Sequence, residues 1–210
     1  MATKLSILIL QIESSLRFVD SLMFGTPYEC QKIKIKIKEK NLCKKKKKDM
    51  KAIVQRVTSA SVRVDGEVIS SIGKGLMVLV GLHRNDTRKE LEYIAKKILS
   101  VRIFDDPVTG KRWNKSVKDL DLEVLCVSQF TLYHILKGNK VDFHLAMGGD
   151  AAKDMYEDLF KELCKNYSET KIKDGKFGAM MEVNIANDGP VTIELESLST
   201  DDQNQTSSLS

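Results

Sequence analysis

The unbroken apolar run Leu76–Leu82, with a second largely apolar segment at Leu122–Val127, most constrains what this chain can fold into. A strand with one face in water alternates apolar and polar residues, whereas a continuous run needs cover on both faces. Between the runs, Thr87 and Glu90 have capping-box spacing and precede apolar residues that recur with helical spacing. The pattern predicts central strands within an α/β protein built of sheet and helix layers.

Local signals predict the remaining elements. Asp65-Gly66 supplies the positive φ angles of a two-residue turn, which indicates a hairpin over 62–69. A second amphipathic helix is expected from about Asp150 to Tyr167. Further strands are expected at 50–57, 101–104, 178–185 and 191–195, and a loop at 134–142.

Charge divides the chain into a basic leading segment and a nearly neutral body. The net charge is +5, but residues 1–49 hold 12 Lys and Arg against 5 Asp and Glu, leaving 22 against 24 in the remainder. We expect a disordered basic extension over 1–49, one domain over 50–197, and a disordered polar tail over 198–210. A body without overall positive charge must use a local patch if it binds nucleic acid.

The function of the leading segment is open between two interpretations. Its lysine block at 44–48 could contact RNA phosphates or act as a nuclear address. The favoured alternative is a dispensable extension, since Met50 offers a downstream start. The apolar stretch 5–10 is too short to span a membrane and resembles a signal peptide poorly, so a cytoplasmic location is expected.

Cysteine and histidine spacing gives no sign of a metal or cofactor. The four cysteines form no Cys-x-x-Cys pair, and His83, His134 and His144 lack the spacing of metal ligands. We expect reduced, structural thiols, no metal site and no cofactor. No Gly-rich phosphate loop is present either.

Two motifs in the body carry a family resemblance: Ser128-Gln129-Phe130-Thr131-Leu132 and Asn187-Asp188-Gly189-Pro190-Val191-Thr192. Because both motifs are present and follow one another in the family's order, residues 50–197 resemble the D-aminoacyl-tRNA deacylase family. A related family acting on a different class of mischarged tRNA usually has Pro-Gln and Thr-Asn-Gly-Pro at these places. One departure is Val141, which stands where the family loop usually has proline.

The resemblance implies a fold and an activity. The fold would be a layered β-β-α sandwich of mostly antiparallel strands with two main helices, assembled as a homodimer. The enzyme would hydrolyse the ester of D-aminoacyl-tRNA, and to some degree of glycyl-tRNA, while rejecting L-aminoacyl-tRNA. This would be a chiral proofreading step in translation quality control.

For catalysis, the resemblance assigns the backbone amides of Phe130 and Thr131 to the oxyanion that forms during ester hydrolysis. Ser128 and Gln129 would shape the pocket, and the 2′-hydroxyl of the terminal adenosine would help to activate water. A rival interpretation makes the Thr131 hydroxyl a nucleophile, which requires a base within hydrogen-bond reach.

For selectivity, the resemblance implies a cis Gly189-Pro190 bond that reaches into the partner subunit's pocket, with Asn187 in the same motif. The two carbonyls would hold the substrate ammonium, and an L side chain would strike the backbone. In an arbitrary sequence Gly-Pro indicates a turn. Arg56 would brace the motif, the alternative being a surface arginine.

Candidate tRNA contacts are four lysines and one aromatic residue. Lys137, Lys140, Lys173 and Lys176 could bind phosphates or simply be solvated. Phe177 could stack on the terminal adenine or belong to the core. His144 is expected to be structural.

Two other classes of function compete with the deacylase. One is a non-enzymatic nucleic-acid-binding protein acting through the basic arm, for which residues 1–49 would be essential. The other is a hydrolase of small D-amino-acid esters, which would not need the terminal adenosine.

Overall fold

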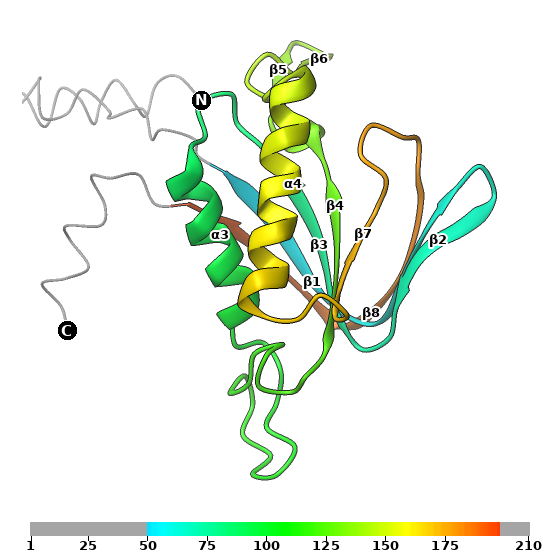
Figure 1. Ribbon diagram of the computed structural model, residues 1–210, viewed down its shortest axis with the longest axis vertical. Coiled ribbons are helices and arrows are strands. Elements are labelled where there is room, and N and C mark those ends of the chain that lie inside the picture. Colours follow the sequence, from blue (N-terminus) through cyan, green and yellow to red (C-terminus); the bar gives the residue numbers. More distant parts are fainter. Residues whose placement is uncertain (1–49, 198–210) are drawn as a thin grey trace, which may run out of the picture. The chain divides into compact units, whose positions relative to one another are not determined.

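The computed structural model describes residues 50–197, so the predicted extension at 1–49 and tail at 198–210 lie outside the described residues. A six-stranded sheet follows the order β2-β1-β3-β4-β7, with β8 paired to β1. Its strands are β1 (Lys51–Val64), β2 (Glu67–Ile72), β3 (Gly75–Gly81), β4 (Glu123–Ser128), β7 (Ile172–Asp174) and β8 (Glu182–Glu196). Helices α3 (Arg88–Ser100) and α4 (Gly149–Asn166) lie together against one face of the sheet (Figure 1).

Strand β1 organises the sheet because both of its edges are paired. Along one edge it runs antiparallel to β8 over nearly its whole length. Along the other it pairs first with β3 and then, after Val57, with β2 from Ala60 onward. The β1–β2 turn has φ values of 53° at Asp65 and 85° at Gly66, which confirms the predicted hairpin.

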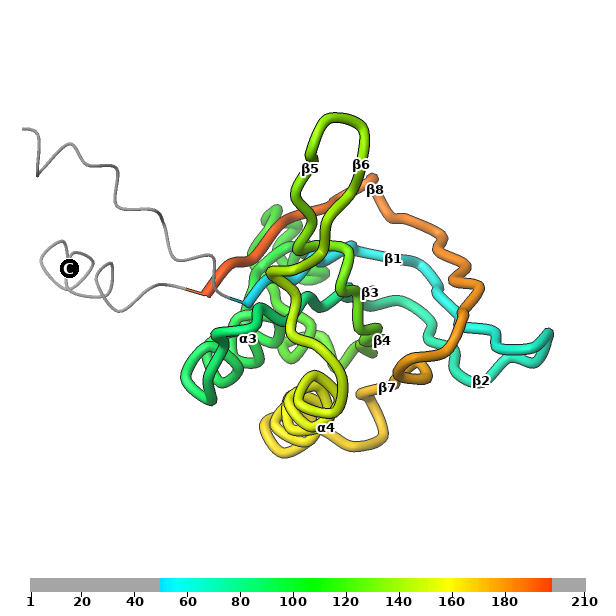
Figure 2. The backbone as a smooth tube through the Cα atoms, turned by 90° about the horizontal axis from the view of Figure 1, so that it is seen from above, coloured from blue at the N-terminus to red at the C-terminus, as the bar shows by residue number. Residues whose placement is uncertain are grey.

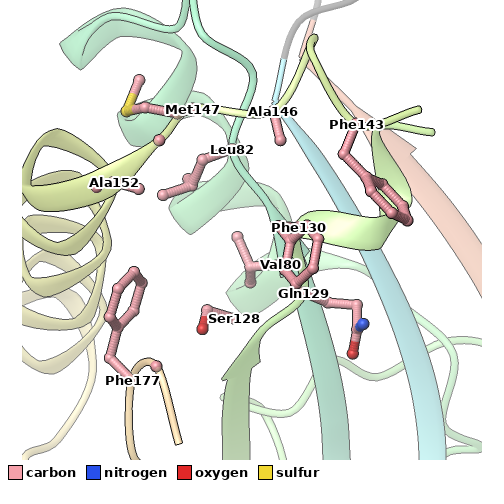
Figure 3. A pocket seen from close by; sticks show the side chains of 13 residues that line it. Val80, Leu82, Ser128, Gln129, Phe130, Phe143, Ala146, Met147, Ala152 and Phe177 are labelled. Carbon is pink, nitrogen blue, oxygen red and sulfur yellow. The ribbon is translucent and has the colours of Figure 1, made fainter. Parts of the chain in front are cut away.

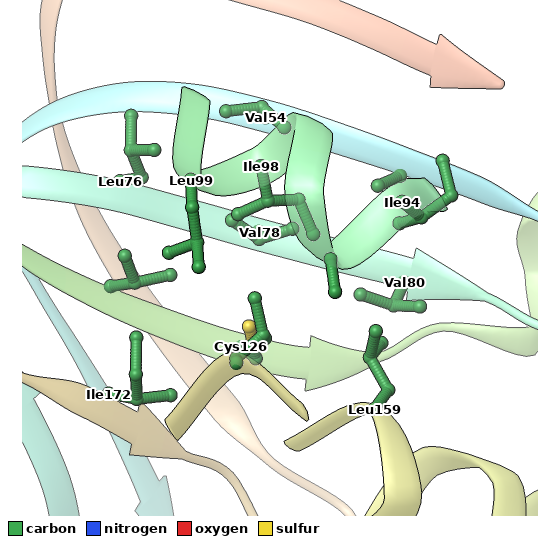
Figure 4. Close-up of a cluster of buried hydrophobic side chains, with 14 of the residues drawn as sticks. Val54, Leu76, Val78, Val80, Ile94, Ile98, Leu99, Cys126, Leu159 and Ile172 are labelled. Carbon is green, nitrogen blue, oxygen red and sulfur yellow. The ribbon is translucent and has the colours of Figure 1, made fainter. Parts of the chain in front are cut away.

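The central strands β3 and β4 are buried on both faces, as their apolar sequences predicted. They lie parallel to each other. Alternate residues such as Val78 and Cys126 pack under the helices in one core (Figure 4). Their neighbours Met77 and Leu125 join a second core on the opposite face, which is closed by residues of β1, β2 and β8. The central strands are therefore covered by the two helices on one face and by folded-over parts of β1, β2 and β8 on the other.

Both predicted helices are present. Thr87 caps α3 with both halves of its capping box, and the Glu90 side chain accepts the Thr87 N–H at 2.8 Å. The apolar stripe of α3 is buried, from Leu91 to Leu99. No helix within 50–197 is long and apolar enough to cross a membrane.

Three local predictions were wrong. Residues 101–104 form no strand, because only Phe104 makes a bridge, to Lys115 within the long α3–β4 connection. The expected loop at 134–142 contains a small hairpin, β5 (Ile135–Lys137) with β6 (Lys140–Asp142). The two last strands are one, since β8 continues through the Gly-Pro motif by bulging instead of turning.

Candidate active site

A cavity of about 390 Å³ opens at the carboxyl ends of β3 and β4. Its walls come from segments distant in sequence: the two strand ends, the segment from Phe143 to the start of α4, and the loop after β7. Figure 3 shows Ser128 between Phe177 on one side and Phe130 with Phe143 on the other. Predicted site residues Ser128, Gln129, Phe130 and Phe177 thus share one cavity.

The first motif turns from β4 into a short 3-10 helix, η1 (Phe130–Leu132). The Gln129 N–H donates to the Val80 carbonyl at 2.7 Å, which ties the turn to β3. Intrahelical bonds begin only with the N–H of Leu132, so the amides of Phe130 and Thr131 precede them. Neither amide has an acceptor within residues 50–197. Phe130 lines the cavity and Thr131 follows it outside the lining, so this turn holds two adjacent N–H groups without an acceptor in these residues.

The Thr131 hydroxyl has no base beside it in the described part of the chain. Its Oγ1 accepts a hydrogen bond from the side-chain amide of Gln129 at 2.5 Å. An amide does not accept a proton at neutral pH, so this contact orients the hydroxyl without activating it. His134 approaches the Thr131 backbone carbonyl through Nδ1 at 3.0 Å instead of the hydroxyl. The geometry favours water over Thr131 as the attacking group.

Aromatic rings form two walls of the cavity. Phe130, with 57% of its surface exposed, meets Phe143 edge to face with ring centroids 5.1 Å apart. Opposite, Phe177 tilts against Tyr156 of α4 at 5.7 Å. Phe177 is half-buried, so one part of its ring packs on the core while another lines the cavity. Both earlier interpretations of Phe177 therefore describe part of its surroundings.

A hydrogen-bonded pair, Tyr156 and Asp174, lies next to Phe177. The Tyr156 hydroxyl donates to Asp174 Oδ1 at 2.5 Å, where Asp174 ends β7 just before the Phe177 loop. Burial raises the pKa of the Asp174 carboxyl, and burial likewise raises the pKa of Tyr156 well above its usual value. The predicted apolar stripe of α4 thus also carries a polar contact.

The β5–β6 hairpin holds several predicted RNA contacts. Lys137 is paired with Asp142, and this contact is the main reason why the pKa of the Asp142 carboxyl lies well below its usual range. His144 adds to that effect, with its Nδ1 2.7 Å from Asp142 Oδ1, so it has a structural partner. Lys140 and Lys176 are exposed, and Val141 is exposed at 42% on the same hairpin.

The second motif lies within β8, and Arg56 contacts it through a hydrogen bond and an ion pair with Asp188. The Arg56 Nε is 3.1 Å from Asp188 Oδ2 and donates to the Asp188 carbonyl at 3.3 Å, while Nη1 donates to the Ile103 carbonyl at 2.6 Å. Only 14% of the Arg56 side chain is exposed, so it is not a free surface arginine. The Gly189-Pro190 bond is cis, and Asn187 is exposed opposite Val57.

The structure does not bring the two motifs together within one chain. On β1, Val57 pairs with Asn187 and Arg56 with Val191, so Asp188–Pro190 bulge out of the ladder there. The cavity begins at Val80, which pairs with Ala52. Four to five residues along β1 correspond to about 15 Å. Gly189 and Pro190 therefore do not line the cavity of their own chain.

Sequence reasoning missed the cavity wall that comes from the segment before α4. Phe143 and Met147 line the cavity from the segment before α4. Nothing in the sequence indicated that Phe143 would meet Phe130. No cluster of three or more possible metal-binding side chains occurs within 50–197.

Comparison with known proteins identifies relatives of this chain. Residues 53–196 match the D-Tyr-tRNA(Tyr) deacylase family. A Drosophila melanogaster D-aminoacyl-tRNA deacylase is 60% identical over 148 residues, 70% of this chain and 92% of that protein. Human D-aminoacyl-tRNA deacylase 1 is also 60% identical, over 70% of each chain.

A solved structure described as a c-Myc DNA unwinding element binding protein shares 58% identity, with a TM-score of 0.68 over 71% of this chain and 99% of that one. A second, described as a probable eukaryotic D-amino acid tRNA deacylase, shares the fold at 17% identity and a TM-score of 0.63.

Proposed function

Because the chain belongs to the D-Tyr-tRNA(Tyr) deacylase family and is a hydrolase of D-aminoacyl-tRNA, we propose that it proofreads chirality, cleaving D-aminoacyl esters and sparing L-aminoacyl esters. The observation that carries this proposal is the pair of amides at Phe130 and Thr131, without acceptors in the described residues, beside an aromatic-walled cavity. The cavity suits the terminal adenosine and its esterified amino acid.

The two amides would stabilise the transition state of ester hydrolysis. Water attacks the carbonyl carbon, the carbonyl oxygen becomes an oxyanion, and the bond to the ribose oxygen then breaks. A free amino acid leaves, and the ribose regains its hydroxyl with a proton from the water. One oxyanion donor is typically worth 10²–10³ in kcat, about 2.7–4 kcal/mol. With no base at Thr131, the neighbouring ribose hydroxyl is the group we assign to orienting the water.

The Gly-Pro motif would act in the cavity of a second copy. It lies about 15 Å along β1 from the cavity of its own chain. It bulges from β8, whose other edge has no partner within residues 50–197, so it could enter the cavity of a second copy although it does not enter its own. Figure 2 shows β8 alongside β1, with which it pairs, at the edge of the sheet. A two-fold dimer, in which each Gly-Pro enters the other's cavity, satisfies both requirements.

Selectivity would follow from backbone contacts alone. The Gly189 and Pro190 carbonyls of the second copy would accept hydrogen bonds from the substrate ammonium. With ammonium and ester both fixed, an L side chain points into that backbone, whereas a D side chain points away. Glycine has no side chain to collide, so glycyl-tRNA should be cleaved as well.

The test is deacylation of D-tyrosyl-, L-tyrosyl- and glycyl-tRNA by the full chain, with elution volume measured in parallel. We expect loss of the D-tyrosyl and glycyl esters only, from a dimer. Comparable cleavage of L-tyrosyl-tRNA would refute the proofreading role. A monomer with full D-selectivity would refute the shared site while leaving the hydrolase intact.

A second candidate is DNA binding, which the description of one solved relative favours. The near-neutral charge of residues 50–210 provides no general attraction for a duplex. Titrating a labelled DNA duplex with the full chain at physiological salt tests it, and a Kd below 1 μM at that salt would support this second function.

A further inference from the structure

The α3–β4 connection presents three consecutive exposed side chains: Lys111, Arg112 and Trp113. Trp113 has 52% of its surface exposed, which is unusual for so large an apolar group. Neither the cavity nor the Gly-Pro motif contains any of the three. The side chains of Lys111 and Arg112 have no hydrogen bond or ion pair with residues 50–197.

This connection is ordered by its acidic residues. Asp105 Oδ1 accepts the Trp113 N–H at 3.0 Å, and Asp106 Oδ1 accepts the Val108 N–H at 2.9 Å. The hydrogen bond from the Val108 N–H is the main reason why the pKa of Asp106 falls to about 2. The two carboxylates thus accept hydrogen bonds from the loop backbone, while the side chains of Lys111 and Arg112 point to solvent. Trp113 is also held at φ 55°, a conformation uncommon for a bulky residue.

Arg56 places this loop next to the Gly-Pro motif. One guanidinium bonds the Ile103 carbonyl at the start of the loop and the Asp188 carbonyl before Gly189. Its Nη2 lies 3.5 Å from the position of a Cβ on Gly189. Trp113 is bonded to Asp105, two residues or about 7 Å beyond Ile103. The loop that carries Trp113 therefore starts beside the Gly-Pro motif.

We propose that Lys111, Arg112 and Trp113 form an RNA-contact site that acts on the tRNA held in the partner subunit's cavity. The inference rests on the proposed shared site, in which this chain's Gly-Pro motif enters that cavity. The acceptor end of a tRNA is single-stranded, with phosphates for the two cations and base faces for the indole. An exposed tryptophan preceded by two cations that have no partner within residues 50–197 matches that chemistry.

The test compares two substrates, D-tyrosyl-tRNA and D-tyrosyl-adenosine, which lacks the rest of the RNA. The variants of the full chain are Trp113→Asn, chosen because asparagine tolerates positive φ, and the double variant Lys111→Ala/Arg112→Ala. Lys89→Ala/Lys96→Ala on α3 is the control, since it removes the same charge from an exposed helix surface.

For Trp113→Asn we expect KM for D-tyrosyl-tRNA to rise about 10-fold at unchanged kcat, as for loss of one stacked base. The double variant should reduce the slope of log KM against log salt by about 1.5, as for loss of two phosphate contacts. Kinetics on D-tyrosyl-adenosine and of the control should match the original chain.

Three results would overturn the site: an unchanged KM for the tRNA, an equal loss on both substrates, or monomeric elution of Trp113→Asn. The last would mean that the indole packs on the second copy. Failure of the unmodified chain to cleave D-tyrosyl-tRNA would instead overturn the proposed function, and the site with it.

Discussion

Replacing Arg56 with lysine tests whether the Gly-Pro motif depends on a guanidinium. Nε of Arg56 serves Asp188, and Nη1 serves the Ile103 carbonyl. An ammonium is a single point of charge and cannot occupy both positions, so Arg56→Lys leaves one of these acceptors unpaired. A hydrogen bond to a charged group is worth about 1.5–3 kcal/mol, which gives an expected loss near 2 kcal/mol. For a domain of this size that is about 4–8 °C in Tm.

The assay pairs urea denaturation with deacylation of D- and L-tyrosyl-tRNA. We expect Arg56→Lys to lose stability and also D-over-L discrimination, because Gly189 would no longer be held against a fixed neighbour. Arg63→Lys is the matched control, since Arg63 lies exposed on the same strand. If Arg56→Lys behaves like Arg63→Lys in both measurements, the bracing argument is wrong.

Three further outcomes follow from burial and close contact. Gly75→Ala should cost about 3 kcal/mol in urea denaturation, because the new Cβ would lie 2.0 Å from the Glu123 carbonyl oxygen; a loss below 1 kcal/mol would contradict this. The folded-state pKa of Asp174 is raised, so ionisation opposes folding, and the original chain should lose stability relative to Asp174→Asn as pH rises above about 4. A stability difference that is constant with pH would refute that reasoning. A chain starting at Met50 should deacylate D-tyrosyl-tRNA as fast as the full chain, and a large loss would assign the extension a role.

The elements that sequence predicted well are those fixed by local chemistry. The Thr87 cap and the stripe that follows it define α3, and Asp65-Gly66 defines a hairpin, without reference to the rest of the chain. Strand β8 was predicted as two because Gly189-Pro190 has the local signature of a turn. Pairing with β1 on both sides of the bulge overrides that signature, and a long-range ladder cannot be seen in a local window.

The candidate site also has one part that the sequence predicted and another that depends on the fold. The motif from Ser128 to Thr131 is contiguous, so its members were certain to be neighbours. The approach of Phe143 to Phe130, and of Phe177 to Tyr156, depends on how α4 and β7 return to the sheet. The distance between Gly189 and the cavity is a property of strand order and register, which only the assembled sheet reveals.

The outer edge of strand β8 also bears on aggregation. Fifteen residues long, the strand has no partner on its outer edge within residues 50–197, and such an edge can template aggregation. The bulge at Asp188–Pro190 divides that edge into two short stretches, and Pro190 has no N–H to offer. A strand from another molecule could not add along the full length in continuous register. Gly189 and Pro190, proposed to discriminate D- from L-aminoacyl esters, would thus also oppose fibril growth.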